Sequence, residues 1–122
     1  MNTRTFDTKL QRCGIDRNRY CELRYFCRRY KQLTRAERRS INEAANIAMG
    51  GEYAWALKRN VCENIPVKSI DAPFSEREFA RRRKIFFAEL DRLCRDRQRR
   101  YAELVAYANA DRSAFEIWRR NR

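Results

Sequence analysis

The sequence predicts an all-α protein: a small helical domain with a helix-turn-helix-like unit and a long C-terminal helix. Three observations favour this fold class. The 122 residues include only 3 glycines and 2 prolines, so few positions break a helix. Apolar residues recur at three- and four-residue spacing in several segments. After Pro73 neither glycine nor proline occurs up to residue 122, so residues 75–122 can form one very long helix.

The first two expected helices span residues 3–13 and about 16–31. Gly14 ends the first helix, and Asp16 is the expected N-cap of the second. One face of the second helix is apolar and carries Tyr20, Leu23, Cys27 and Tyr30, with Phe26 beside them. Tyr25 lies on the other side. Its ring can pack against another helix, which we favour, or stack on a nucleic-acid base.

A third helix is expected to begin after Thr34, because Thr34 and Glu37 have the spacing of a capping box. The buried seam of this helix consists mainly of small side chains: Ile41, Ala44, Ala45 and Ala48. The pair Gly50 and Gly51 ends the helix and allows the chain to turn. A helix with so small a seam can pack closely on a neighbour.

The next two elements are short. A fourth helix is expected over about residues 52–60, with Trp55 as its bulky anchor. Pro66 then opens a single helical turn over residues 67–70, and Pro73 ends it. The region therefore predicts a helix and a turn that lead directly into the long C-terminal helix.

The long helix combines an N-terminal cap, an apolar seam and a cationic face. Ser75 and Glu78 form a second capping-box pattern. At 100° per residue, one side carries Phe79, Phe86, Leu90, Leu93 and Cys94. The opposite side carries Arg77, Arg81, Lys84 and Arg95, with Arg92 nearby. One face can therefore bury against a core while the other meets a polyanion.

The end of the chain reads as an extension of this helix. Residues 95–100 are polar on every side, which is typical of a segment that bridges solvent or contacts a partner. A renewed apolar face follows, with Tyr101, Leu104, Val105 and Ala108. It must pack on the body of the protein or on a second copy, which would make a homodimer. We expect a break near residues 109–111, with Asp111 capping a last short helix that contains Phe115 and Trp118.

Charge points to an anionic partner. The chain has 29 Lys+Arg against 16 Asp+Glu, a formal net charge of +13, which suits nucleic acid; the alternative explanation is solubility with solvated helix faces. Arginine supplies most of this charge, and its planar fork matches phosphates and guanine edges. No apolar run approaches the ~20 residues that cross a membrane.

The cysteine spacing and the absence of histidine argue against a metal site and against enzymatic catalysis. Five cysteines occur without a C-x-x-C spacing, and there is no histidine. We therefore expect no metal site, no cofactor and reduced thiols in an intracellular protein. Histidine is the commonest general base, and no glycine-rich phosphate loop is present, so we expect no enzyme.

The helices divide into an N-terminal segment (1–51), a helix-turn-helix-like unit (52–94) and a C-terminal extension (95–122). In the middle unit the helix from residue 75 to about 93 is the expected reader of DNA, with its first turns at base edges and flanking cations on phosphates. The predicted nucleic-acid-binding residues are Ser75, Glu76, Arg77, Arg81, Arg82, Lys84, Arg92 and Arg95. Lys84, Arg92 and Arg95 fall on the phosphate side. Arg83 falls on the apolar side, where an internal ion pair or a stem along the core is expected.

Two blocks of the chain also resemble a known family. GIDRNRYCELRYFCRRY at residues 14–30 resembles the opening of small prophage proteins of Gram-positive bacteria. The later run F-x-x-RRKIFF at 79–87, which comes after NVCENI at 60–65, resembles their closing helix. These blocks are similar to phage late-gene regulators of the ArpU and RinA type, whose ends look like sigma factor region four. The resemblance implies sequence-specific binding to double-stranded DNA, activation of phage transcription or packaging, a reader at residues 75–84 and a place in the bacterial cytoplasm.

Two other functions remain open. The first is a small phage-encoded inhibitor of a host nucleic-acid machine such as a CRISPR effector, which would dock on a host protein or on guide RNA. The long helix with its extension favours this alternative. The second is RNA or single-strand binding through Tyr25, Tyr101, Tyr107 and the interspersed arginines, although no RRM or KH motif is present.

Overall fold

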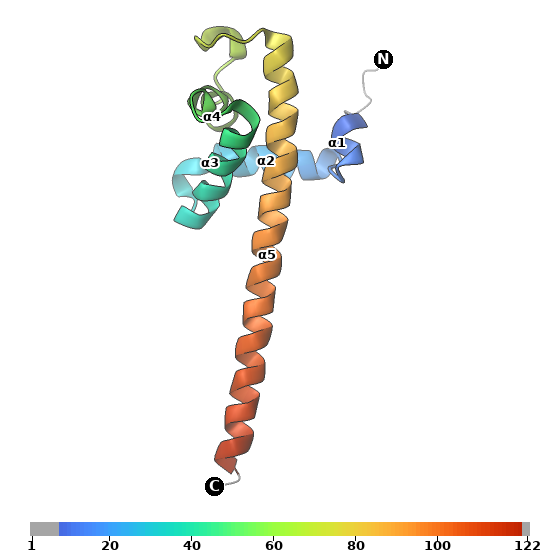
Figure 1. The fold of residues 1–122 in the computed structure, drawn as a ribbon, viewed down its shortest axis with the longest axis vertical. Coiled ribbons are helices and arrows are strands. Elements are labelled where there is room, and N and C mark those ends of the chain that lie inside the picture. Colours follow the sequence, from blue (N-terminus) through green and yellow to red (C-terminus); the bar gives the residue numbers. More distant parts are fainter. Residues whose placement is uncertain (1–7, 121–122) are drawn as a thin grey trace.

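The computed structural model of the chain describes the backbone of residues 8–120 and the side chains of residues 10–110 and 119–120. It confirms the all-α fold class, because the described residues form helices and turns without a β-strand. The helices are α1 (Thr8–Arg12), α2 (Arg17–Arg28), α3 (Arg35–Met49), α4 (Ala54–Glu63) and α5 (Glu76–Arg120), with single 3-10 turns η2 (Tyr30–Gln32) and η3 (Val67–Ser69). In Figure 1, α5 runs the length of the molecule, and the other elements gather around its N-terminal half.

The start of α2 follows the sequence prediction. The Asp16 carboxylate accepts a hydrogen bond from the backbone N–H of Arg19 at 2.8 Å, as an N-cap does. Gly14 has a φ of +83°, the left-handed conformation that ends α1. Of the first predicted helix, residues 3–7 lie outside the described residues. The second helix ends at Arg28, slightly earlier than predicted, and η2 continues it as a tighter turn.

The predicted capping box of α3 is complete. The Glu37 N–H donates to the Thr34 hydroxyl at 3.2 Å, and the Thr34 N–H donates to the Glu37 carboxylate at 2.8 Å. At the other end Gly50 has a φ of +82° and stops the helix. The predicted seam is buried: Ile41, Ala44, Ala45 and Ala48. Its small side chains let α3 lie along α5 on one side and against α4 on the other.

The fourth helix differs from the prediction in its bounds and in its anchor. It runs from Ala54 to Glu63 and ends at Asn64, which adopts the left-handed conformation. The Trp55 side chain is 43% exposed, so the prediction that it anchors the helix is wrong. Trp55 lies two positions from Leu57, which is about 200° around the helix, so the two side chains point in opposite directions. The fully buried Leu57 is the anchor.

A short connection joins α4 to α5. The single turn η3 follows Pro66, close to the predicted position. Phe74 then packs edge-on against Tyr53, with ring centroids 5.4 Å apart, and fastens the connection to the start of α4. The order of helix, turn and helix is the one predicted, but the packing is different from a helix-turn-helix: α5 packs mainly along α3, and α4 packs mainly on α3 and α2.

The long helix α5 is continuous over 45 residues. The predicted break at residues 109–111 is wrong, because Asp111 lies within the helix. Without glycine or proline, each further residue adds a backbone hydrogen bond to an existing helix, and this outweighs the tendency of an aspartate to start a new one. The side chains of Phe115 and Trp118 lie outside the described residues.

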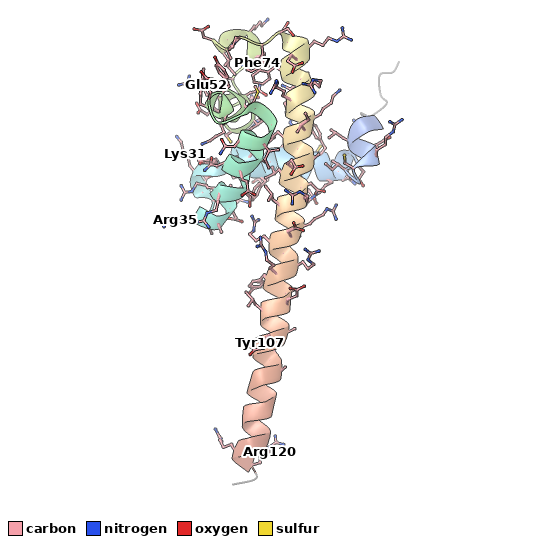
Figure 2. The ribbon with its side chains drawn as sticks, viewed as in Figure 1. Lys31, Arg35, Glu52, Phe74, Tyr107 and Arg120 are labelled. Carbon is pink, nitrogen blue, oxygen red and sulfur yellow. The ribbon has the colours of Figure 1, made fainter. Side chains whose placement is uncertain are left out.

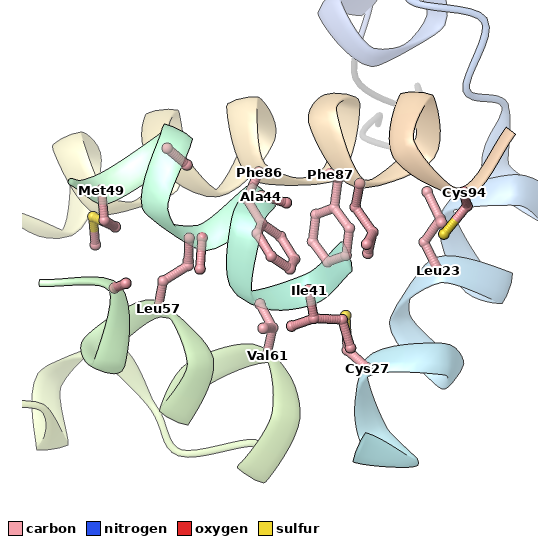
Figure 3. Close-up of a cluster of buried hydrophobic side chains, with 14 of the residues drawn as sticks. Leu23, Cys27, Ile41, Ala44, Met49, Leu57, Val61, Phe86, Phe87 and Cys94 are labelled. Carbon is pink, nitrogen blue, oxygen red and sulfur yellow. The ribbon is translucent and has the colours of Figure 1, made fainter. Parts of the chain in front are cut away.

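One hydrophobic core holds the helices together (Figure 3). Among the described side chains, its largest fully buried members are Phe79, Phe86, Phe87, Ile15, Leu23, Ile41, Leu57, Leu90 and Cys27. These residues lie on both sides of position 51, so segments 1–51 and 52–94 share a core. The core residue furthest along α5 is Cys94, and residues 101–110 are all exposed. The part of α5 after Cys94 is therefore an arm that projects from the body formed by the preceding residues (Figure 1).

Candidate nucleic-acid interface

The first turn of α5 carries the predicted DNA-reading residues, and its cap is only half of a capping box. The Glu78 N–H donates to the Ser75 hydroxyl at 3.0 Å. The Glu78 carboxylate does not complete the box and instead accepts hydrogen bonds from Arg81 at 2.6 and 3.1 Å and from Arg82 at 2.9 Å. We call these three residues the Glu78 clamp.

The Glu78 clamp changes the electrostatics at the start of α5. Hydrogen bonds from Arg81 and then Arg82 lower the pKa of the Glu78 carboxyl to about 2. The same hydrogen bond raises the pKa of Arg81. Both arginines therefore carry a partner within the protein, and Arg81 must exchange Glu78 for a base or a phosphate before it can contact DNA.

Arg82 fastens α5 to α3. Its guanidinium donates to the backbone carbonyl of Ala48 at 3.1 Å and lies 4.9 Å from the centre of the Phe74 ring. A cation at the C-terminal end of α3 is also favoured by the helix dipole. Together with the bond to Glu78, these contacts give Arg82 a structural place, where the sequence predicted a base-proximal one.

Arg77 is a predicted base-reading cation whose side chain is open at this end of the molecule. Like Ser75 and Glu76, it is exposed, and its side chain makes no hydrogen bond or ion pair with the described part of the chain. Lys84 is half-buried and already has an interaction within the protein. Of the predicted cations on the first three turns of α5, Arg77 can bind a ligand without giving up a contact.

The predicted phosphate-binding arginines further along α5 are paired with acids. Arg92 donates to Glu89 at 2.8 and 3.0 Å, and this hydrogen bond raises the pKa of Arg92. Arg95 donates to Asp91 at 2.8 Å. The charges of Arg92 and Arg95 are therefore partly offset locally, and their contribution to a phosphate contact is smaller than the sequence predicted.

Asp91 is a buried acid that sequence reasoning missed. The residue is only 4% exposed, and its carboxylate accepts hydrogen bonds from Arg19 at 2.6 Å and from Arg95. The bond to Arg19 ties α2 to α5. The available signal was its position one turn after the core residue Phe87, on the same face of α5.

A cleft between α2, α4 and α5 gathers arginines that do not face acids. It encloses about 290 Å³, and its lining residues are Tyr20, Arg24, Arg28, Asn60, Val61, Asn64, Arg83 and Phe87. Arg28 donates to the Asn64 side chain at 2.9 Å, and Arg83 donates to the Asn60 side chain at 3.0 Å. We call it the arginine cleft. No Asp or Glu is among these lining side chains, so its positive charge is uncompensated locally.

The arginine cleft could not be recognised from the sequence. The sequence shows that Arg24 and Arg28 are one turn apart on α2. It does not show that Arg83 lies near them, because this depends on how α2 packs against α5. Arg83 was expected to form an internal ion pair or to lie along the core. It is half-buried, and its described partner is the neutral side chain of Asn60.

Tyr25 lies on the outer face of α2. Its side chain is 65% exposed, so the favoured prediction that it packs on another helix of the chain is wrong. The guanidinium of Arg29 lies 5.5 Å from the centre of its ring, and this contact leaves most of the ring open to solvent. The alternative prediction, base stacking, stays a prediction.

Comparison with protein-family models, curated proteins and solved structures found no match to the chain. None of the helices between residues 8 and 120 has both the length and the apolar character needed to cross a lipid bilayer.

Proposed function

We propose that this protein binds double-stranded DNA and acts as a phage-type transcriptional regulator. The observation that carries the proposal is the arginine cleft: Arg24, Arg28 and Arg83 converge on a polar hollow that no carboxylate lines. Guanidinium groups in this arrangement favour an anionic ligand with several oxygen acceptors, and a phosphate backbone provides them. The net charge of +13 attracts such a ligand over long range.

Base reading is assigned to Arg77. Exposed at the first turn of α5 and without a partner in the described chain, it can form a bidentate contact with guanine in a major groove. Arg81 is a second reader that must first leave Glu78. Arg82 holds α5 against α3 through its hydrogen bond to the Ala48 carbonyl and makes no base contact in this proposal.

The experiment is a selection from a library of randomised duplexes, followed by affinity measurements on the enriched sequence. Wild-type protein is expected to enrich one motif. Arg77→Ala is expected to reduce discrimination against a changed base pair by about 1–3 kcal/mol, the value of one bidentate base contact. The matched control is Arg35→Ala, an exposed arginine at the start of α3.

Two outcomes would contradict the proposal. If wild-type protein enriches no motif, the regulator function fails, although binding to any polyanion could persist. If Arg77→Ala and Arg35→Ala weaken all sequences by the same factor, the assignment of Arg77 as a base reader fails.

A second candidate function is inhibition of a host nucleic-acid machine by docking on its protein or RNA. The arm favours it, because large apolar side chains are exposed there: Tyr101, Leu104, Val105 and Tyr107. Figure 2 shows Tyr107 on the arm, well away from the body. A pull-down of tagged protein from nuclease-treated host lysate separates the two functions. A stoichiometric protein partner that is lost with Leu104→Glu, together with no motif from the selection, would favour inhibition.

A further inference from the structure

Two cysteines from different helices meet at the edge of the core. Cys27 is at the end of α2 and is completely buried, with its side chain next to Ile41 (Figure 3). Cys62, near the end of α4, is half-buried. α2 packs on α4, and Cys62 packs against the core that contains Cys27, so the two thiols are close enough to affect each other's ionisation. We call them the Cys27–Cys62 pair.

Cys62 opens onto a basic hollow at the surface. The hollow has a volume of about 760 Å³ and is lined by Arg28, Tyr30, Lys31, Gln32, Arg38, Lys58, Cys62 and Glu63. The Lys58 ammonium lies 5.0 Å from the centre of the Tyr30 ring and the Arg38 guanidinium 6.0 Å from it. Four cations against one carboxylate make the hollow positive, and small reagents can reach Cys62 through it.

The two thiols differ in their tendency to ionise. The hydrogen bond with Cys27 lowers the pKa of Cys62, and the nearby Lys58 lowers it further, against the opposing effects of burial and Glu63. The same hydrogen bond, together with burial, raises the pKa of Cys27. Of the two sulfurs, the accessible one is therefore the more easily ionised, and the buried one holds its proton more strongly. A thiolate next to a second thiol is the arrangement of reversible redox sites.

We propose that Cys62 and Cys27 are a peroxide-reactive dithiol that forms a disulfide between α4 and α2. The Cys62 thiolate attacks one oxygen of hydrogen peroxide and becomes a sulfenic acid, and hydroxide leaves as the O–O bond breaks. The Cys27 sulfur then attacks the sulfenic sulfur, forming the S–S bond. The sulfenic hydroxyl group takes up the Cys27 proton and leaves as water.

The other cysteines lack this combination. Cys13 and Cys21 are both exposed at the surface. Cys94 is buried, and its sulfur accepts a weak contact from Arg97 at 3.9 Å. Among the described residues, no group of three cysteine, aspartate or glutamate side chains is arranged to hold a metal ion. The Cys27–Cys62 pair is therefore assigned to redox chemistry and not to metal binding.

The test is mass spectrometry of the full chain after treatment with hydrogen peroxide. Reduced protein is oxidised, unfolded, alkylated and digested with trypsin. We expect a mass loss of two hydrogen atoms, two fewer alkylated thiols, and a cross-link between the peptides Tyr25–Arg28 and Asn60–Lys68, which trypsin separates because both are flanked by basic residues. Added dithiothreitol should restore all thiols.

Variants separate this site from general thiol oxidation. Cys62→Ser, at a half-buried position, should abolish the cross-link and slow the consumption of peroxide, whereas Cys13→Ser/Cys21→Ser should keep the cross-link. A cross-link that involves Cys13, Cys21 or Cys94 in place of Cys27 would overturn the proposal. Oxidation of Cys62 to a sulfinic acid, with Cys27 still free to be alkylated, would also overturn it. Both outcomes are measured on wild-type protein, so they do not depend on the folding of any variant.

Discussion

At the scale of single residues, most of the arginines predicted to bind DNA already have a partner. Arg81 and Arg82 are held by Glu78, Arg92 by Glu89, and Arg95 by Asp91. The exposed pairs of Arg81 with Glu78 and of Arg92 with Glu89 contribute little to stability. Every one of these pairs, the one with the buried Asp91 included, makes its arginine less available to an outside anion. Sequence position alone places a charge on a face of a helix, and it does not say whether a neighbour one turn away neutralises that charge.

Glu78→Gln tests whether the Glu78 clamp limits DNA binding. Gln keeps the backbone N–H that Ser75 accepts but removes the charge that holds Arg81. We expect tighter binding to a DNA duplex and a salt dependence that is steeper by up to about one phosphate contact. Titration of salt in a fluorescence anisotropy assay measures both. Glu52→Gln, on an exposed acid in the turn before α4, is the control with the same change of charge.

The pH dependence of the Glu78 clamp has a defined sign. The pKa of Glu78 is about 2 in the folded protein and ordinarily 4.5. The carboxylate therefore favours the folded state above pH 4.5, and this contribution is lost as the pH falls from 4.5 towards 2. In Glu78→Gln, residue 78 no longer titrates. It should therefore cause no difference between the salt dependence of binding at pH 7 and the salt dependence at a pH between 4.5 and 2. If Glu78→Gln and Glu52→Gln behave alike at neutral pH, the clamp does not control Arg81.

At the scale of the elements, the helix ends were more predictable than the packing. The caps at Asp16 and Thr34 and the stops at Gly14 and Gly50 are local, because each depends on hydrogen bonds or dihedral angles within a few residues. The anchor of α4 was mistaken because size alone suggested Trp55. The buried face of a helix is decided by which residues share it with the neighbouring helices.

The same reasoning explains what was found and missed on α5. Placing residues at 100° intervals correctly predicted that Phe79, Phe86, Leu90 and Cys94 are buried. It did not predict the burial of Phe87, which is 2% exposed. α5 is covered on one side by α3 and crossed on another by α2, so its buried stripe is wider than a single seam. Tyr20 of α2 packs edge-on against Phe87 at 5.1 Å, a contact that no sequence pattern reveals.

Phe86→Ala tests the packing of α5 on its neighbours. Phe86 is fully buried and contacts Phe87 edge-on at 5.1 Å between ring centroids. Its truncation should lower the free energy of unfolding by about 3–5 kcal/mol, because it removes a large apolar side chain and leaves a cavity. Urea unfolding followed by circular dichroism measures this value. Ile85→Ala, one position earlier and 37% exposed, should cost less than about 1 kcal/mol. Similar values for the two variants would mean that the face of α5 is misassigned.

At the scale of the whole molecule, positive charge gathers in several places, and two of them are candidates for contact with phosphates. One is the arginine cleft in the body, where the helices α2, α4 and α5 meet. The other is the arm, where the exposed Arg99 and Arg100 are followed by the exposed aromatic residues Tyr101 and Tyr107 along a helix that continues from the core. The total charge was evident from composition, but its concentration in a cleft without carboxylates arises from tertiary packing, which brings together residues more than 50 positions apart in the chain, such as Arg24 and Arg83.

If the protein binds DNA as proposed, the salt dependence of binding should show whether the arginine cleft or the arm contacts the phosphates. Arg24→Gln/Arg28→Gln removes two positive charges from the arginine cleft, and Arg35→Gln/Arg59→Gln removes two from exposed positions that do not line it. Each lost phosphate contact reduces the slope of log K against log salt by about 0.9, so the cleft variant should lose nearly two units of slope on every sequence.

The control variant has the same net charge, so it should bind more weakly only through long-range attraction and keep its slope near that of wild-type protein. Because phosphate contacts carry no sequence information, the cleft variant should also keep the preferred motif that Arg77→Ala loses. Equal slopes for the two double variants would place the phosphates away from the cleft, and the arm with Arg99 and Arg100 would become the next surface to test, because both side chains are exposed there.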